Sequence, residues 1–311
     1  MSFIELNQVL KRYDTKVSVN HLSLKIEKGE VFGLLGPNGA GKSTTIHMLT
    51  GLLPYDQGEI LIDGRSVHKH TLDIKKKIGL VPQDLAIYEA LTARENVTFF
   101  GRLYGLRGKL LRERVDEALD FVGLKDRASD KPGAYSGGMK RRLNIACAIM
   151  HHPELIIMDE PTVGIDPQSR NHIMESIRKL NAMGSTIIYT SHYMEEVEAI
   201  STRVGIMDHG KLIACGTKEE LLEQLGRDEK MFITVDTLRD PALAELRRHP
   251  HILSVEVQEN ELEILLKPTD TVFQDILFIL SNHQIKPISF KRVEPNLEAL
   301  FLSLTGRTLR D

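Results

Sequence analysis

One short run near the amino end constrains the fold of this chain more than any other stretch. It consists of Gly36, Pro37, Asn38, Gly39, Ala40, Gly41, Lys42, Ser43 and Thr44. The spacing G-x-x-x-x-G-K-[ST] is that of a phosphate-binding loop, which connects a buried strand to a helix. Residues 31–35 are apolar and strand-like, and residues 44–53 suit a helix. We therefore expect an α/β domain that binds a nucleoside triphosphate.

The chemistry of this loop follows from its residue types. Glycines let the backbone curl so that its N–H groups point at phosphate oxygens, and the following helix adds the partial positive charge of its N-terminus. Lys42 is expected to reach the β- and γ-phosphates, and Ser43 to offer its hydroxyl to Mg²⁺. A chance glycine-rich turn is the weaker explanation, because a strand and a helix flank the loop.

Composition narrows the class of protein. The chain has 311 residues, enough for two domains, and its 41% hydrophobic and 27% charged content is ordinary for a globular protein. A net charge of −3 argues against a dedicated nucleic-acid binder. No apolar run approaches the roughly 20 residues that cross a bilayer, and no secretory signal is visible. We expect a cytosolic protein that reaches a membrane only through a partner.

The order of apolar runs predicts the architecture of the first part of the chain. Residues 2–10 and 17–27 alternate apolar and polar side chains, as half-buried antiparallel strands do, and 58–63 adds a strand before an Asp-Gly turn. A helical pattern occupies about 92–150. Short buried strands are expected at 155–158, 185–190 and 204–207. Strands alternating with helices predict a largely parallel sheet.

A polar stretch at 222–230 separates this part from a second domain, so we expect domains at 1–222 and 230–311. The elements expected in the second domain are strand 231–235, helix 241–248, strand 252–258, strand 261–267, helix 271–282 and strand 285–292. The order β-α-β-β-α-β is the split βαβ, or ferredoxin-like, plan. A last amphipathic segment, 297–304, is expected to pack back as a helix.

Two acidic residues end the apolar run 155–158. Asp159 is expected to hold Mg²⁺ through its water shell, and Glu160, facing the other way along the strand, to orient or deprotonate the attacking water. The alternative is a strand that ends in two solvated acids, which is common. The phosphate-binding loop at residues 36–44, upstream in the chain, favours the catalytic interpretation.

A third motif, Ser136-Gly137-Gly138, begins another helix. Ser136 can cap it, and the two glycines allow backbone N–H groups to approach an anion closely. The cationic residues 140–142 in its first turns oppose the helix dipole, so something negative is expected opposite them. The alternative is an ordinary capped helix with a cationic start.

With these motifs in order, residues 1 to about 220 resemble the nucleotide-binding subunit of an ATP-binding cassette (ABC) transporter. Residues 36–44 correspond to its Walker A loop, 136–138 to its signature loop, and Asp159 and Glu160 to its Walker B motif. The resemblance implies a P-loop α/β cassette with a helical subdomain, a mixed sheet, and ATP hydrolysis.

The resemblance also assigns roles that no single residue would justify. Tyr13 stands where the family has an aromatic ring that stacks on adenine. Gln83 matches the glutamine that senses Mg²⁺ and the γ-phosphate, and His192 matches the switch histidine that contacts the γ-phosphate. Residues 164–166 resemble the D-loop. Catalysis would then rest on Glu160, His192 and Gln83, and Mg²⁺ on Ser43, Gln83 and Asp159.

In this family two copies pair head to tail. ATP in the Walker A loop of one copy would be covered by Ser136 and Gly138 of the other, so the resemblance implies a homodimer. Tyr135 and Met139 stand where Leu and Gln are usual, outside the Ser-Gly-Gly that would touch phosphate.

The helical subdomain, about 84–150, contains a stretch beside Gln83 that resembles the permease-docking region of the family, residues 84–108. The cassette with its compact tail is similar to ATPase subunits of ABC-2-type exporters, such as the daunorubicin- and linearmycin-resistance kinds. The resemblance implies export of a drug or antibiotic through a separate permease, at the cytoplasmic face of a bacterial membrane. Export of lipid or polysaccharide, import, and a soluble ATPase acting on nucleic acid are the alternatives.

Overall fold

The computed structural model describes residues 2–223, 229–267, 272–293 and 296–305. The chain forms two compact units, one over residues 1–218 and one over residues 219–308. Among the described residues the first unit contains two sheets and the second unit one, and each unit has a core of its own.

The amino-terminal part of the first unit is an antiparallel sheet with the strand order β2-β1-β4-β5. Its strands are β1 (Ser2–Tyr13), β2 (Lys16–Glu27), β4 (Gln57–Ile62) and β5 (Arg65–Ser66). The predicted alternation is confirmed, since Leu22, Leu24 and Ile26 are buried while their neighbours face outward. Strand β1 is longer than the sequence indicated and carries Tyr13 at its end.

The second sheet of this unit has the order β10-β9-β3-β8-β7-β6 and is parallel except where β10 pairs with β9. Its strands are β3 (Val31–Leu35), β6 (Ile78–Val81), β7 (Leu155–Asp159), β8 (Thr186–Ser191), β9 (Arg203–Asp208) and β10 (Lys211–Gly216). Every residue of β3, β7 and β8 is buried, which explains their continuous apolar runs. Because these three strands are neighbours, the loops after them meet at one edge of the sheet.

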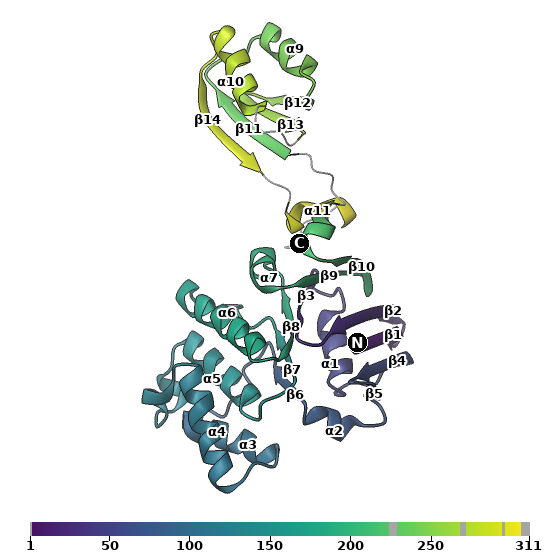
Figure 1. The fold of residues 1–311 in the computed structure, drawn as a ribbon, viewed down its shortest axis with the longest axis vertical. Helices are drawn as coiled ribbons and strands as arrows, with labels where there is room; N and C mark the ends of the chain where they lie inside the picture. Colours follow the sequence, from purple (N-terminus) through teal and green to yellow (C-terminus); the bar gives the residue numbers. More distant parts are fainter. Residues whose placement is uncertain (1, 224–228, 268–271, 294–295, 306–311) are drawn as a thin grey trace. The chain divides into compact units, whose positions relative to one another are not determined.

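The first unit also contains α-helices. They are α1 (Lys42–Leu49), α2 (Thr71–Lys75), α3 (Ala93–Leu103), α4 (Gly108–Phe121), α5 (Gly137–Ile149), α6 (Pro167–Ala182) and α7 (Met194–Ile200). Figure 1 shows α3, α4 and α5 grouped on one side of the unit, away from β1, β2 and β4. The predicted helix 44–53 was wrong at its end, because Gly51 takes a left-handed φ of 63° and the helix stops at Leu49.

The second unit contains β11 (Glu229–Val235), α9 (Asp240–Arg248), β12 (Ile252–Gln258), β13 (Glu261–Leu266), α10 (Val272–Asn282), β14 (Pro287–Val293) and α11 (Leu297–Thr305), after the short α8 (Lys218–Glu223). The predicted order of elements is present. The strand order β12-β13-β11-β14, antiparallel throughout, is that of a split βαβ sheet. Its core includes Ile233, Leu262 and Ile276.

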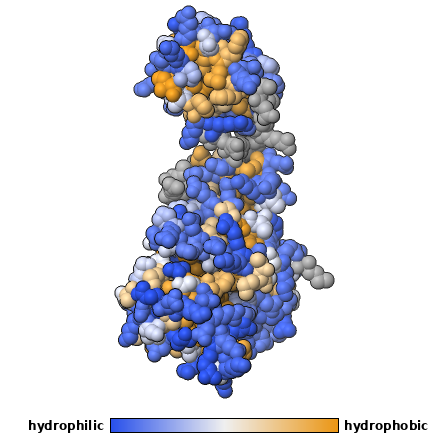
Figure 2. Space-filling view, turned by 60° about the vertical axis from the view of Figure 1, so that its left-hand side comes forward, coloured by the Kyte–Doolittle hydropathy of each residue, from blue (hydrophilic) through white to orange (hydrophobic). Residues whose placement is uncertain are grey.

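Some large apolar side chains of the second unit stay on its surface. Phe278, Ile288 and Phe290 are all more than half exposed. Figure 2 shows hydrophobic surface on this unit, whereas the visible face of the first unit is mainly hydrophilic with scattered apolar patches.

Candidate functional site

A cavity of about 210 Å³ opens where the loop after β3 meets β1 and β2. Its walls are Tyr13, Lys16, Ser18, residues 37–44, Gln83 and Glu160. Gly41 has a φ of 106°, and a Cβ there would lie 2.6 Å from the Ser18 carbonyl oxygen, so only glycine fits. The loop predicted to bind phosphate therefore forms a concave backbone surface, and α1 begins directly from it.

Lys42 is buried at the base of this cavity. Its Nζ donates to the carbonyl oxygens of Gly36 at 2.6 Å and Pro37 at 3.3 Å, and it lies 3.7 Å from Glu160 Oε1. Burial lowers the pKa of Lys42, and the nearby carboxylates of Glu160 and Asp159 oppose that shift. The Lys42 ammonium can therefore give up its contact with one of these oxygens and bind a phosphate oxygen in its place.

Asp159 and Glu160 are only 5% and 6% exposed, which excludes a pair of solvated acids. Simple alternation along one strand was the wrong reason for their divergence: β7 ends at Asp159, and Glu160 adopts a left-handed φ of 47°. Thr190 fixes this turn. The Glu160 N–H donates to Thr190 Oγ1 at 2.9 Å, and the Thr190 hydroxyl donates to Asp159 Oδ1 at 2.7 Å.

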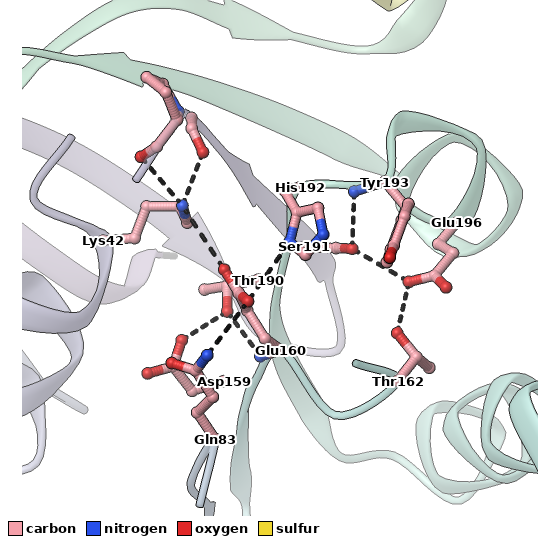
Figure 3. Close-up of polar contacts among 12 residues, drawn as sticks. Lys42, Gln83, Asp159, Glu160, Thr162, Thr190, Ser191, His192, Tyr193 and Glu196 are labelled. Carbon is pink, nitrogen blue, oxygen red and sulfur yellow. Dashed lines mark hydrogen bonds and ion pairs between the residues drawn. The ribbon is translucent and has the colours of Figure 1, made fainter. Parts of the chain in front are cut away.

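The Glu160 carboxylate is the meeting point of three loops. Its Oε2 lies 3.3 Å from His192 Nδ1 and 3.5 Å from Gln83 Nε2 (Figure 3), and its Oε1 faces Lys42. The structure thus brings together Lys42, Gln83, Asp159, Glu160 and His192, which follow four different strands. A carboxylate in this place can accept a proton from a water beside a phosphate held by Lys42.

Tyr13 lies at the rim of the cavity. Its side chain is 46% exposed, and Lys11 Nζ lies 5.8 Å from the ring centroid. Close by, the Ser18 and Thr44 hydroxyls are hydrogen bonded at 3.0 Å, which ties β2 to the start of α1. An exposed ring at the mouth of a phosphate-sized cavity can stack on a flat base.

The donors present suit Mg²⁺ in a nucleotide site. Among the described residues no group of three or more His, Cys, Asp or Glu side chains could hold a metal ion. Mg²⁺ keeps much of its water and is held by one or two carboxylates together with substrate phosphates. Ser43 and Gln83 line the cavity together with Glu160, the residue after Asp159. With the Gln83 amide nitrogen directed at Glu160, its amide oxygen is left for a metal.

The predicted motif 136–138 does not line this cavity within one chain. Ser136 caps α5 by accepting the Met139 N–H at 3.2 Å. A Cβ on Gly138 would lie 1.9 Å from Ser169 Oγ on α6, whereas a Cβ on Gly137 would meet nothing within 4 Å. The lack of a side chain at Gly138 therefore serves helix packing, while Ser136 and Gly137 are exposed. A contact between Gly138 and a nucleotide of a second copy stays a prediction.

The departure at Tyr135 has a local explanation. Tyr135 is buried, and its hydroxyl donates to the Arg127 carbonyl oxygen at 2.6 Å. The negative group expected near the cationic turn is supplied by the chain itself, since Lys140 pairs with Glu89 at 2.7 Å. Arg141 donates to the Pro82 carbonyl oxygen at 3.0 Å and so ties α5 to the segment before Gln83.

Two features escaped the sequence analysis. Thr190 was counted only as part of a buried strand, although its hydroxyl connects Asp159 and Glu160. Glu196 received no role, yet it is 5% exposed and accepts hydrogen bonds from three hydroxyl groups. In the 164–166 segment, Asp166 caps α6 by accepting the Ser169 N–H at 2.9 Å. The only sequence feature that indicated the contacts of Thr190 and Glu196 was the pair of hydroxyl residues at the end of β8, Thr190 and Ser191.

Comparison with known proteins gives a consistent result. A family model described as ABC transporter matches residues 19–163. The linearmycin resistance ATP-binding protein of Bacillus subtilis (strain 168) is 50% identical over 310 residues, covering 99% of this chain and 100% of that protein. The Nod factor export ATP-binding protein I of Sinorhizobium fredii is 39% identical over 309 residues, covering 99% of this chain and 87% of that protein.

Solved ATP-binding cassettes match a large part of the chain. An ATP-binding subunit of an ABC transporter, 29% identical, superposes with a TM-score of 0.67 over 72% of this chain and 94% of that one. A dimeric ATP-binding cassette in a post-hydrolysis state, bound to ADP and Pi and 28% identical, gives a TM-score of 0.64 over 69% of this chain and 98% of that one.

Proposed function

The chain belongs to the ABC transporter family as an ATP-binding, ATP-hydrolysing subunit, and from this premise we propose that it powers the export of an antibiotic or similar drug. One observation carries the proposal: the likeness to the linearmycin resistance protein extends over 99% of this chain at 50% identity, second unit included. The relative named for Nod factor export is similar over the same length at 39% identity, which supports export over import.

Hydrolysis is assigned to the cavity residues. Backbone N–H groups of 37–44 and the Lys42 ammonium hold the phosphates, and the Tyr13 ring stacks on adenine. Ser43, Gln83 and Asp159 would hold Mg²⁺, which would neutralise charge on the phosphates. Glu160 orients the attacking water and accepts its proton, because its carboxylate is the one that both Lys42 and His192 face. His192 then contacts the γ-phosphate.

The site is completed by a second copy of the chain. Ser136 and Gly137 are open to an anion but lie outside the cavity, so within one chain they have no phosphate to contact. Head-to-tail pairing would place them over the nucleotide bound by the partner. The similar cassette solved as a dimer with ADP and Pi supports this arrangement.

A separate ABC-2-type permease is the proposed membrane partner. Within the described part of the chain, none of the helices has the length and apolarity that a bilayer span requires. The loop after Gln83 offers a docking surface, because Leu85 and Tyr88 are 41% and 50% exposed. The Tyr88 ring packs edge-on against Phe99 with centroids 4.9 Å apart, so the aromatic surface continues onto α3.

Buried amide side chains hold this docking loop rigid. Asn96, fully buried, accepts the Tyr88 N–H at 2.8 Å and donates to the Tyr88 and Leu91 carbonyl oxygens. Asn144 accepts the Ala86 N–H at 3.2 Å. Because the loop is held in place beside Gln83, a conformational change of the permease that moves the loop would also move Gln83 at the nucleotide site. The protein would then act at the cytoplasmic face of a bacterial membrane.

The function is tested by expressing this chain with the permease genes that neighbour it in a drug-sensitive bacterium. We expect a raised minimal inhibitory concentration for amphipathic antibiotics, and no increase when Glu160→Gln replaces the wild-type chain. Copurification of the permease from membranes should weaken in the Tyr88→Asp variant. Unchanged drug sensitivity together with accumulation of a lipid or polysaccharide in a deletion strain would instead assign export of those compounds. Recovery of nucleic acid in place of a permease would reject transport.

A further inference from the structure

Behind the candidate site lies a buried carboxylate to which the roles above assign nothing. Glu196, on α7, is 5% exposed. Its Oε2 accepts hydrogen bonds from the hydroxyls of Thr162 at 2.7 Å and Ser191 at 3.0 Å (Figure 3). The Tyr189 hydroxyl donates to the same oxygen at 2.7 Å. Three hydroxyl groups on one carboxylate oxygen form a charge-assisted cluster, which is stronger than neutral hydrogen bonds.

The other carboxylate oxygen faces a cation. Arg170 Nε on α6 lies 3.1 Å from Glu196 Oε1, an ion pair without the alignment of a hydrogen bond. The Arg170 guanidinium also lies over the Tyr193 ring, 5.2 Å from its centroid. The Tyr193 and His192 rings are in turn 4.1 Å apart. Contacts thus run from Glu196 through Arg170 and Tyr193 to His192.

A second route reaches the same histidine along the backbone. The Ser191 hydroxyl donates to Glu196 and accepts the Tyr193 N–H at 2.9 Å, so it holds the backbone on both sides of His192. Thr162, two residues after Glu160, is bound to the same oxygen. Glu196 therefore touches the two segments that carry Glu160 and His192.

Tyr189 must be a donor in this cluster. Burial, and next the neighbouring Glu196 carboxylate, raise the pKa of Tyr189 far above its ordinary value. The phenol therefore keeps its proton at any working pH. The Tyr189 hydroxyl lies 3.2 Å from the Thr162 hydroxyl, and both donate to the Glu196 carboxylate.

Resting on the roles proposed above for Glu160 and His192, we propose that Glu196 is a positioning residue for ATP hydrolysis. It clamps the hydroxyls of Thr162 and Ser191 and the Arg170 cation so that the His192 ring stays beside the Glu160 carboxylate. Glu196 touches neither the nucleotide nor the water. It acts through the placement of His192.

The test uses Glu196→Gln in the full-length protein, with Glu195→Gln as the matched control. Glutamine keeps the volume and one acceptor oxygen, but it removes the charge and turns an amide N–H₂ toward Arg170. At a temperature where both proteins are folded, we expect kcat for ATP hydrolysis to fall about tenfold, with the affinity for a fluorescent ATP analogue nearly unchanged. Glu195 is exposed on the same helix, so its variant should keep wild-type turnover.

A double-mutant cycle with His192→Ala separates positioning from general structural damage. If Glu196 acts through His192, the loss caused by Glu196→Gln should shrink to about twofold or less once His192 is absent. An undiminished tenfold loss in the His192→Ala background, or unchanged turnover in the wild-type background, would overturn the proposal. Full turnover by His192→Ala alone would instead refute the role given to the histidine.

Should Glu196→Gln fail to fold, Ser191→Ala tests the same step. It removes the hydroxyl that joins Glu196 to the backbone beside His192 and leaves the carboxylate paired with Arg170. We expect a severalfold fall in kcat that also vanishes without His192. If the losses in kcat caused by Ser191→Ala and His192→Ala were additive, this would again contradict a role of Glu196 in positioning His192.

Discussion

His192 Nδ1 lies 3.3 Å from Glu160 Oε2, although the two residues follow different strands, β8 and β7. Because β7 and β8 are parallel neighbours, their carboxyl ends bring both side chains to one edge of the sheet. Lys42 reaches the same carboxylate from the loop after β3. One acid therefore stands between a cation that can hold phosphate and an imidazole that can contact it.

This arrangement predicts that Glu160→Gln folds, binds ATP and loses turnover. The amide cannot accept a proton, so kcat should fall by roughly a hundredfold or more while an ATP-bound dimer accumulates. Phosphate release and size-exclusion chromatography with ATP would measure the two effects. Lys42→Ala is the contrasting variant: without the ammonium that contacts phosphate, nucleotide affinity itself should fall. Wild-type turnover in Glu160→Gln would refute its assigned role.

Local sequence was enough to predict the phosphate loop and the order of strands and helices, because each depends on neighbouring residues. The loop needs glycines at close spacing, and Gly41 is indeed the position where a side chain would strike Ser18. The alternation in β2 and the continuous apolar run of β7 likewise depend on local burial.

What the sequence could not predict depends on which strands become neighbours. Asp159 and Thr190 pair across β7 and β8, and that pairing alone makes the threonine hydroxyl a partner of the acid. Gly138 was interpreted through a possible anion, but its lack of a side chain is required by Ser169 on another helix. The Glu196 cluster has the same origin, since its donors come from separate segments.

The position of Tyr13 leads to a prediction about base recognition. Stacking on a base contributes about 1–3 kcal/mol in other proteins, so Tyr13→Ala should weaken ATP binding about fivefold or more. Tyr13→Phe keeps the ring and should bind normally. Titration with ATP and with tripolyphosphate distinguishes base from phosphate contacts, since only ATP affinity should respond. An equal loss of affinity for both ligands would contradict stacking.

A partly buried histidine predicts acid sensitivity of the fold. His151 stacks on Tyr104 with ring centroids 3.5 Å apart, and burial lowers the pKa of His151 to about 4 from 6.5. Between those values the unfolded chain binds a proton that the folded chain does not, so stability falls as pH drops from 6.5 toward 4, by up to about 3 kcal/mol.

The matched variants for this effect are His151→Phe and His172→Gln. Phenylalanine can still stack on Tyr104. The Ile78 carbonyl oxygen keeps a hydrogen-bond donor in this variant, because the Tyr104 hydroxyl donates to it at 3.2 Å. Urea unfolding at pH 7 and pH 5 should show a smaller pH dependence in His151→Phe than in the wild type. His172 is exposed, and its variant should retain the wild-type dependence. An identical pH dependence in all three proteins would exclude His151 as the source.

The two glycines of the 136–138 motif should behave in opposite ways. Gly138→Ala places a Cβ 1.9 Å from Ser169 Oγ, so α5 and α6 must move apart, at a cost of about 1–3 kcal/mol in the free energy of unfolding. Gly137→Ala meets open space and, within a helix, should leave stability equal or slightly higher.

Turnover provides the second half of this comparison. If Gly137 approaches a nucleotide bound by a partner copy, Gly137→Ala should lower ATPase activity while monomer stability is kept, because the added methyl would occupy the contact surface. The loss should be steeper at low protein concentration, where the dimer is scarce, and urea unfolding with ATPase assays over a concentration series measures both effects. Full activity of a stable Gly137→Ala protein at every concentration would mean that this face of α5 does not meet nucleotide.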